Sequence, residues 1–418
     1  MFGKGALIVV MGFSIAFSMY QLKLNSAVLS TRDSFNAYYM RTQVQQTALN
    51  SINYGLNQMW LTDTLSATYE LNTALCSSEV VISTDGLDTV KVVARAWGSV
   101  FNQDEFVEFG RSMRMEDSIV AFFSYQLPAS RYFWFTNTEG NVYWVTGDTI
   151  TGPLHTNDII RTYGSPVFEG KVTAQGGITP DPSLGTSSAV YNGGWEVGGG
   201  VSIPTDVSTL YDAAVTGNNG NAVNTVSLFD ETVELEFLDT GEVVSTLAGE
   251  DPDTVALSVI APTGVIYSTA DVRVKGILDG RVSIYSGQSI YIDDDMVYKD
   301  SARDNPNSND LLGLVANDNI VVADNTANNE NAYIEASMIA MTGEFMAENH
   351  RNRDVSGTLY ITGSVMQSDR GAVATFDWAD GSILSGFQKN YVYDERLQGV
   401  SPPYFPFIRS LSLIAWWE

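Results

Sequence analysis

Two histidines and a single cysteine limit the catalytic chemistry that this chain can carry. The histidines are His155 and His350, and the cysteine is Cys76. The chain has only two histidines and no pair of cysteines, so a zinc site built from cysteine and histidine is excluded. One cysteine cannot form an intramolecular disulfide, and we expect Cys76 to be a buried free thiol.

Nucleophilic catalysis of the Ser-His-Asp type would have to use one of these two histidines, and the sequence contains no G-x-S-x-G elbow. His155 stands two residues before Asn157 in a strand-and-turn pattern, where we expect a hydrogen bond at a corner of the chain. His350 lies in the polar stretch 348–353, which predicts a solvated loop. We therefore predict that the protein is not an enzyme.

Acidic clusters are the other candidates for chemistry. The carboxylates that could bind Ca²⁺ are Asp293, Asp294, Asp295, Asp304 and Asp310. Their spacing lacks the order and the glycine of an EF-hand loop, so ordinary turns are expected, with calcium as the alternative and no other cofactor. A polysaccharide-cleaving β-helix enzyme is a second alternative for the whole chain, in which Asp293 to Asp295 would act with Arg281.

The charge of the chain is distributed unevenly. Residues 1–62 hold four basic residues and one acid, a net charge of +3, and the remainder holds 18 basic and 48 acidic residues, a net charge of −30. A body this acidic repels nucleic acid, and no nucleic-acid partner is expected. The positive end suits a membrane segment whose first residues stay in the cytoplasm.

The N-terminal stretch is long and apolar enough to organise the chain. Residues 5–22 carry no charge and lie between Lys4 and Lys23, which is just long enough to cross a bilayer. Residues 25–61 contain no proline and one glycine, and their apolar residues recur at helical spacing: Val28, Ala37, Tyr38, Met40, Val44, Ala48, Ile52, Leu56 and Met59. The pattern predicts one continuous helix over residues 1–62. No small-x-small site follows the apolar run, so we expect the segment to be retained.

The rest of the chain reads as mainly β. Residues 63–130 predict a small α+β neck, with strands at 90–97 and 106–115 and either a helix or a strand at 118–125. Residues 131–418 predict a β-rich surface domain of very short strands, interrupted at 176–226 by an excursion rich in Gly, Asn, Ser and Thr that is not expected to be helical. The apolar C-terminus, residues 410–418, should dock as a last strand or as a cap, on this domain or on a neighbouring subunit, and capping an end of the solenoid is the favoured interpretation.

Weak internal repeats favour a particular kind of β architecture. Residues 152–160 and 313–321 both contain a glycine, apolar residues, an Asn/Asp pair at offsets five and six, and then β-branched residues, and 363–369 is a looser copy. Short strands with Gly and Asn at recurrent corners are typical of a solenoid. The predicted fold class is therefore α+β, a long helix followed by an irregular β-helix or solenoid, with a β-sandwich as the alternative.

Several short motifs stand out along the chain. They are the start, Met1 to Val10; Gly147-Asp148-x-x-x-Gly152-Pro153-x-His155-Thr156-Asn157; Gly164 to Phe168; Gly363-Ser364-Val365-x-Gln367-x-x-Arg370-Gly371; and Lys389-x-Tyr391-x-Tyr393-Asp394-x-Arg396 followed by Pro402-Pro403-x-Phe405-Pro406. In these motifs the chain resembles large pilin-like bacterial surface proteins related to the minor pilin PilX. The resemblance implies a role in a type IV pilus-like filament or its assembly, and implies no enzymatic activity. One departure is that no acid precedes Asp33, whereas type IV pilins usually carry a glutamate as the fifth residue after the cleavage point.

These observations predict a structural filament subunit that polymerises with copies of itself through its N-terminal helix. The expected filament interface is Leu7, Ile8, Val9, Val10, Phe13, Ile15, Phe17, Tyr20 and Leu24. The precursor is expected in the inner membrane with a pilus-type assembly machinery, and the product in an extracellular filament. The alternative is a membrane-anchored, non-polymerising adhesin or a minor pilin.

Overall fold

The computed structural model describes residues 2–62, 65–84, 89–100, 113–379 and 382–417. The chain forms two compact units, one from Met1–Gln126 with Ser410–Glu418 and the other from Leu127–Arg409. A long apolar N-terminal helix followed by a mostly β body is confirmed. The expected surface domain, 131–418, differs from this division at its C-terminal end, because its last nine residues group with the helix and the neck.

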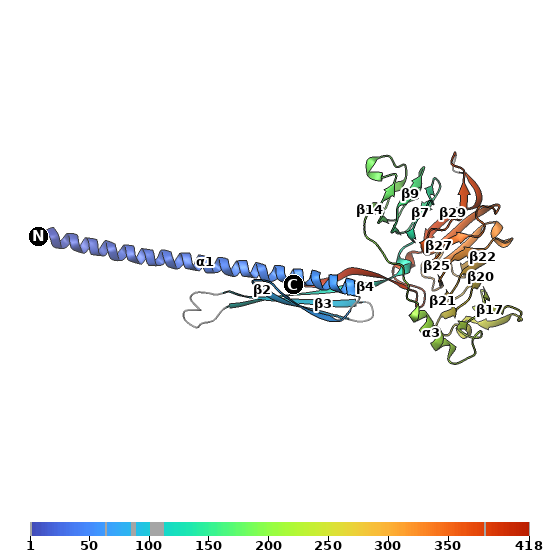
Figure 1. Ribbon diagram of the computed structural model, residues 1–418, viewed down its shortest axis with the longest axis horizontal. Coiled ribbons are helices and arrows are strands. Elements are labelled where there is room, and N and C mark those ends of the chain that lie inside the picture. The colour runs from blue at the N-terminus through green and yellow to red at the C-terminus, as the bar shows by residue number, and fades with distance from the viewer. Residues whose placement is uncertain (1, 63–64, 85–88, 101–112, 380–381, 418) are drawn as a thin grey trace. The chain divides into compact units, whose positions relative to one another are not determined.

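The first unit is built on helix α1 (Phe2–Thr62), which runs unbroken for 61 residues, about 90 Å. Its C-terminal part lies along a β-sheet, as Figure 1 shows. The two pack together through one stripe of helix side chains. The buried residues of this stripe are Met40, Val44, Ala48, Ile52 and Met59. Their spacing of four to seven residues keeps them on one face of the helix. They are five of the nine residues in the apolar periodicity, of which Val28 and Tyr38 are exposed.

The neck sheet is antiparallel and has the order β1-β2-β3-β4-β30. Its strands are β1 (Ala67–Asn72), β2 (Cys76–Thr84), β3 (Thr89–Val100), β4 (Met113–Pro128) and β30 (Phe407–Trp417). The stretch 118–125 is thus a strand. The strand expected at 106–115 lies outside the described residues except for its last three, which begin β4.

Small residues let the helix approach the neck sheet closely. The hydroxyl groups of Ser51 and Ser78 form a buried hydrogen bond of 2.6 Å between α1 and β2. A Cβ atom on Gly55 would lie 2.9 Å from the side chain of Val80. Cys76 is buried as a free thiol at the same interface, as expected.

The C-terminal strand corrects one expectation. Residues 410–418 were expected to dock as a last strand or a cap on the β domain or on a neighbour. Residues up to Trp417 do form a last strand, β30, but it lies beside β4 at the edge of the neck sheet and caps no end of the β domain. Trp417 contacts Phe122 of β4 edge-to-face, with ring centroids 5.3 Å apart. A strand that ends in large apolar side chains gains more from cross-strand contacts on a long partner than from covering a small end surface.

The second unit begins with three sheet faces that the chain visits in rotation. The strands are β5 (Trp134–Thr138), β6 (Trp144–Val145), β7 (Thr149–Ile150), β8 (Leu154–Thr156), β9 (Ile160–Tyr163), β10 (Val167–Phe168), β11 (Val172–Ala174), β12 (Ile178–Thr179), β13 (Val190–Tyr191) and β14 (Trp195–Val197). Every third strand pairs in parallel, as β5-β8-β11-β14, β6-β9-β12 and β7-β10-β13. The side chains that point inward form the core.

The chain then continues from the other end of the same unit. The elements are α3 (Ser208–Asn218), β15 (Leu228–Phe229), β16 (Val233–Phe237), β17 (Glu242–Leu247), β18 (Asp253–Ala256), α4 (Leu257–Ile260), β19 (Val265–Ser268), β20 (Val272–Leu278), β21 (Arg281–Ser286), β22 (Ile290–Tyr298), β23 (Leu311–Ala316), β24 (Ile320–Val322), β25 (Ala332–Ala340), β26 (Phe345–Ala347), β27 (Val355–Asp369), β28 (Ala374–Phe376) and β29 (Ile383–Tyr393), with short 3₁₀ turns at Ala129–Arg131, Pro182–Leu184, Ala327–Asn329 and Glu395–Gln398.

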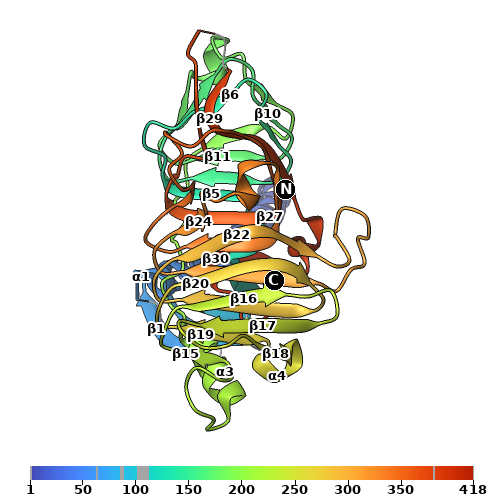
Figure 2. The same ribbon diagram turned by 90° about the vertical axis from the view of Figure 1, so that its right-hand side faces the viewer.

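Parallel pairing β15-β19-β21-β23-β25-β27 leads back to β5, where Val365 pairs with Trp134. The two runs therefore share one ladder, which is visible in Figure 2.

The expected excursion at 176–226 is wrong in two respects. Strands β12, β13 and β14 belong to the parallel ladders, and α3 is a helix. Strands of two or three residues can pair without a run of apolar residues. A polar composition such as theirs is also typical of loops, so it does not indicate a strand. The buried stripe of α3 consists of Leu210, Ala213, Ala214 and Gly217, and residues this small give a weak periodic signal.

The internal repeats are confirmed as equivalent positions in one ladder, with a correction of register. Strands β8, β23 and β27 come from the three copies and all lie in the β5-containing ladder. The successive pairings place Leu154 at the position of Leu314, whereas the sequence match aligned Leu154 with Val315. A shift of one residue reverses which side chains face inward, and Leu154 and Leu314 both face the core.

Two glycines allow long strands to bend from one sheet face to the next. Gly276 in β20 has φ = +107° and Gly363 in β27 has φ = +148°. A Cβ atom would lie 2.1 Å from the Phe237 carbonyl oxygen at Gly276 and 1.9 Å from the Ala336 carbonyl oxygen at Gly363. Only glycine satisfies both the backbone angle and the space at these corners.

Replacing Gly363 by alanine should lower the free energy of unfolding by about 3 kcal/mol, combining the cost of a positive φ with that of overpacking. Gly177→Ala is the matched control, because Gly177 has φ = +103° but nothing within 4 Å of the position that an added Cβ would take. The control should lose only about 1 kcal/mol. Urea unfolding of the detergent-solubilised chain measures both values, and equal losses would contradict the steric argument.

Candidate functional site

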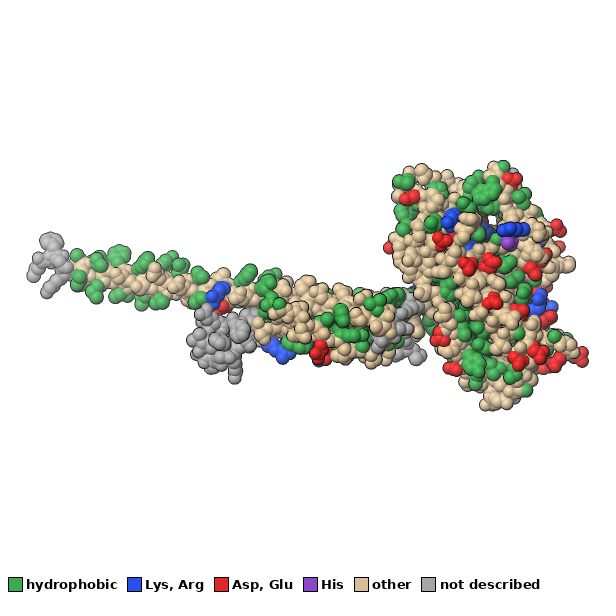
Figure 3. All heavy atoms as spheres, viewed as in Figure 1, with side chains coloured by type: hydrophobic (Ala, Val, Ile, Leu, Met, Phe, Trp, Pro, Cys, Tyr) green, Lys and Arg blue, Asp and Glu red, His purple; other side chains and the backbone are tan. Residues whose placement is uncertain are grey.

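The nine residues expected to form a filament interface all lie on the exposed N-terminal half of α1. Every one of these side chains, from Leu7 to Leu24, is at least 51% exposed in the single chain. By length and composition α1 could cross a membrane, since its most apolar 18-residue window has a mean hydropathy of 1.6 and is 0% buried. Figure 3 shows these apolar side chains along the free part of the helix. Burial of the same helix begins at Met40.

The acidic residues proposed as calcium ligands are engaged by other groups. Asp293 pairs with Arg273, and one carboxylate oxygen of Asp295 accepts a hydrogen bond of 2.8 Å from the Tyr333 amide. The two carboxylate oxygens of Asp310 accept from the amides of Gly280 and Asp300. Within the described ranges no three acidic, histidine or cysteine side chains come together as a metal site. Calcium binding stays a prediction.

The two remaining candidates lie in different surroundings. Asp294 lies with Asp293 and Asp295 in strand β22 and accepts a hydrogen bond from the Asp295 amide, whereas Asp304 lies in a turn and its amide donates to the Ser301 carbonyl. Arg281, which the enzyme alternative paired with this acidic cluster, donates instead to the carbonyl of Ser401 at 3.0 Å. The expectation of ordinary turns is therefore wrong for Asp293 to Asp295, whose backbone belongs to a sheet.

His155 makes the corner hydrogen bond that the sequence predicted. Its Nε2 lies 3.1 Å from Asn157 Oδ1 and its Nδ1 lies 2.6 Å from Thr173 Oγ1. The ring also stacks on Phe135, with centroids 5.5 Å apart. Burial lowers the pKa of His155, opposed by its hydrogen bond to Asn157. A neutral imidazole fixed in this way is a structural group.

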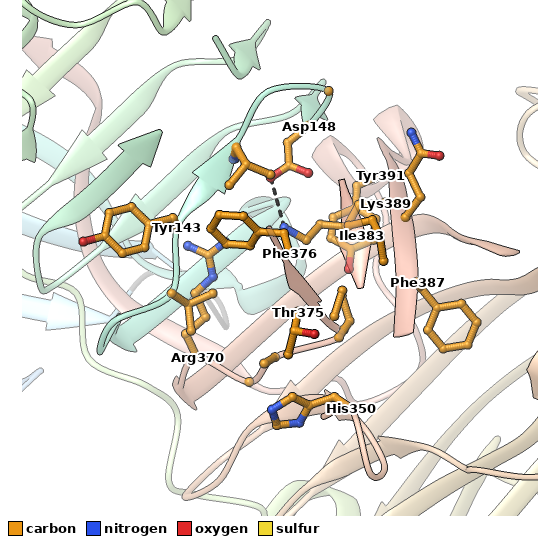
Figure 4. A pocket seen from close by; sticks show the side chains of 18 of the residues that line it. Tyr143, Asp148, His350, Arg370, Thr375, Phe376, Ile383, Phe387, Lys389 and Tyr391 are labelled. Carbon is orange, nitrogen blue, oxygen red and sulfur yellow. Dashed lines mark hydrogen bonds and ion pairs between the residues drawn. The ribbon is translucent and has the colours of Figure 1, made fainter. Parts of the chain in front are cut away.

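The second unit contains a cavity of about 420 Å³ that the sequence analysis did not identify as a site. It lies among the segment from Asn141 to Asp148, the turn at His350, residues 370–376 and strand β29. Figure 4 shows the labelled side chains that line it. We call it the seam pocket, because β7 pairs with β29 here, through Ile150 and Tyr391, where the two runs of strands meet.

Two ion pairs lie at the seam pocket. The Lys389 ammonium is 3.0 Å from Asp148 Oδ2, and Arg370 Nη1 is 2.5 Å from Glu139 Oε2. The side chains of Arg370 and Glu139 are 2% and 0% exposed. Arg370 also covers the ring of Trp144, with its guanidinium carbon 3.9 Å from the ring centroid. Burial lowers the pKa of Lys389, opposed by the charge of Asp148.

A hydroxyl group in the same pocket has no protein partner among the described residues. Tyr391 is 2% exposed, and its phenol oxygen makes no hydrogen bond to any of them. Burial raises the pKa of Tyr391, so the phenol keeps its proton and is a donor. An unmade hydrogen bond of a buried hydroxyl costs about 1–3 kcal/mol, which a bound water or ligand would recover.

Aromatic side chains stand at the rim of the seam pocket. Trp378 packs edge-to-face on Tyr143, with centroids 5.3 Å apart, and lies 4.7 Å from Phe376. The side chain of Trp378 is 55% exposed. The pocket thus combines an accessible aromatic surface with buried charged and polar groups, which is typical of small-molecule sites.

The residues of the seam pocket come from separate motifs of the sequence. Asp148, Arg370, Lys389 and Tyr391 each belong to one of the stretches that resemble the pilin-like proteins. Sequence reasoning could not join those stretches, because Asp148 and Lys389 are 241 residues apart. The available signal was the presence of charged residues inside otherwise strand-like motifs.

Replacing Arg370 by methionine should lower the free energy of unfolding by about 3–5 kcal/mol, because it leaves the Glu139 carboxylate buried without its partner. The double variant Glu139→Gln with Arg370→Met should lose clearly less. Lys171→Met is the matched control, since Lys171 and Glu196 pair at 2.6 Å on the surface, and it should cost under about 1 kcal/mol. Chemical denaturation measures all three, and a double variant as unstable as Arg370→Met would contradict the charge argument.

Because the folded pKa of His155 lies below its unfolded value, the unfolded chain binds a proton first as the pH falls. The stability of the native chain should therefore decline between about pH 7 and pH 5 relative to that of a His155→Gln variant. His350 is present in both proteins, so its contribution cancels. Denaturation midpoints across this pH range test the expectation, and parallel curves for the two proteins would refute it.

Comparisons of this chain with protein-family models, with curated proteins and with solved structures found no match. The chemistry of the two candidate regions therefore follows from their own side chains. The exposed half of α1 is an apolar surface, and the seam pocket is a cavity with apolar and charged side chains in its lining and an aromatic rim.

Proposed function

We propose that this protein is a structural subunit of a type IV pilus-like extracellular filament and that it polymerises through α1. The supporting observation is the exposed apolar half of that helix. The residues from Leu7 to Leu24 are not packed against any described part of their own chain, while the same helix is buried from Met40 onward. A large exposed apolar surface on one element marks an interaction site.

The same surface offers both a driving force and a fit for copies of itself. Burying a large apolar side chain contributes about 1.5–3 kcal/mol, and nine such residues are available. A shallow apolar groove is lined by Val9, Gly12, Phe13 and Ala16, and nothing lies within 4 Å of the missing side chain of Gly12. Small residues of this kind let helices pack closely. The helix requires no acid to associate in this way.

The rest of the chain suits the outside of such a filament. The neck sheet on the C-terminal half of α1 follows the pilin plan of a helix with an antiparallel sheet. We propose that the second unit is an irregular β-helix, and its three parallel ladders support this. A net charge of −30 outside residues 1–62 keeps a repeated surface layer soluble.

Before assembly, the helix would hold the subunit in the inner membrane, from which a pilus-type machinery would extract it. A membrane-anchored adhesin or minor pilin that does not polymerise is the second candidate, since the exposed helix serves an anchor equally well. The polysaccharide-cleaving alternative has less support, because Asp293 is paired with Arg273 and Asp310 with backbone amides.

Val10→Asp or Phe13→Asp should abolish filaments, because each places a charge on the apolar surface that must be buried. Val259→Asp is the matched control, since Val259 is 53% exposed on α4 in the other unit, and Phe13→Leu keeps the helix apolar. Both controls should form filaments. Electron microscopy of sheared surface material gives the readout.

Normal filaments from Val10→Asp and Phe13→Asp would contradict the proposal that the filament assembles through α1. Membrane-bound monomers from the wild-type chain, without any fibres, would favour the non-polymerising anchor instead. Circular dichroism of each purified variant establishes that the β body still folds.

A further inference from the structure

We infer that the seam pocket binds a small sugar acid, a single pyranose ring that carries a carboxylate. This goes beyond the proposed filament and does not rest on it. The pocket lies wholly within the second unit, and its lining includes Asp148, Arg351, Arg370, Lys389 and Tyr391.

The pocket carries a small excess of positive charge. Glu139 neutralises Arg370 and Asp148 neutralises Lys389, whereas Arg351 also lines the pocket and makes no ion pair with a described residue. The chain outside residues 1–62 carries a net charge of −30, so even this excess is an exception within it. Figure 3 shows basic side chains beside a hollow on this unit. A partly enclosed cavity concentrates the field of its charges and selects an anion.

The hydrogen-bonding capacity of the pocket is only partly used. Lys389 donates to Asp148, and an ammonium group has three donors. The phenol of Tyr391 is buried, protonated and unpartnered among the described residues. Together they offer donors to a carboxylate and to ring hydroxyls. A ligand that lacked acceptors would leave the phenol unsatisfied.

The rim of the pocket supplies a surface for a ring. Trp378 is exposed and is held by Tyr143 and Phe376, and the hydroxyl of Tyr163 donates to the Trp378 carbonyl at 2.8 Å. The indole is therefore positioned before any ligand arrives. The apolar face of a pyranose can pack on it while the polar edge of the sugar reaches the charged side chains. A cavity of about 420 Å³ accommodates a single sugar ring.

The test uses the detergent-solubilised full chain and three probes of the same ring size, D-glucuronate, D-glucose and D-glucosamine, in isothermal titration at neutral pH. Glucuronate should bind saturably and at least about tenfold more tightly than glucose, and glucosamine should bind most weakly. Added salt should weaken glucuronate binding more than glucose binding. Equal affinity for the three sugars, or no saturable binding of glucuronate, would overturn the inference.

Single-residue variants test whether glucuronate binds in the seam pocket. Tyr391→Phe removes one oxygen and should weaken glucuronate binding about three- to tenfold. Trp378→Ala should weaken it about tenfold, whereas Trp195→Ala, at another exposed tryptophan of the same unit, should not change it. Arg351→Glu should weaken binding, whereas Arg131→Glu, at an exposed arginine away from the pocket, should not. Wild-type affinity in Tyr391→Phe and Trp378→Ala would overturn the site.

Each variant must also keep the thermal transition of the wild-type chain. Tyr391→Phe loses no packing volume in the core, and Trp378 is more than half exposed, so both should do so. Filament formation is independent of these changes. Loss of glucuronate binding with normal filaments supports the seam pocket as a separate site.

Discussion

The parallel hydrogen bonds between β27 and β5 are the interaction on which the second unit depends. They join Val365 to Trp134 and so unite two runs of strands that would otherwise each expose an unpaired edge. The pairing of β5 with β27 lies within the ladder rather than at its end. The chain therefore enters the second unit close to the point at which it leaves it. The amide of Ala129 donates to the carbonyl of Pro406 at 3.0 Å. That proximity returns the C-terminus to the neck sheet, where β30 pairs beside β4.

The seam pocket is a consequence of the same joint. The turn that holds Asp148 belongs to the first run of strands, and β29, which holds Lys389 and Tyr391, belongs to the second. Bringing these segments together buries two ion pairs. A buried ion pair adds little net stability to the fold, but removing either of its partners is strongly destabilising. Charged groups retained at such a cost in a cavity are a better indication of binding than of folding. The orphan phenol of Tyr391 supports the same interpretation.

The two halves of helix α1 have different surroundings. Its C-terminal half is buried on the neck sheet and fixes that sheet, whereas its N-terminal half leaves large apolar side chains in the open. The proposed filament and the proposed sugar-acid site therefore depend on different units of the chain. Assembly would use the apolar helix, and ligand binding would use the seam pocket in the acidic body.

The sequence by itself determined the properties that depend on neighbouring residues. The uninterrupted helix, its change from an apolar to an amphipathic pattern after Lys23, the uneven charge and the hydrogen bond of His155 at its corner all follow from residues a few positions apart. Only the tertiary structure decided the register of the repeats, the helix α3 within a polar stretch, the place of β30 and the seam pocket. Val365 pairs with Trp134 through backbone hydrogen bonds that any residue except proline can make. The folded strands then bring the side chains of Asp148 and Lys389 together across 241 residues. Residue patterns over a few positions therefore cannot identify such long-range partners.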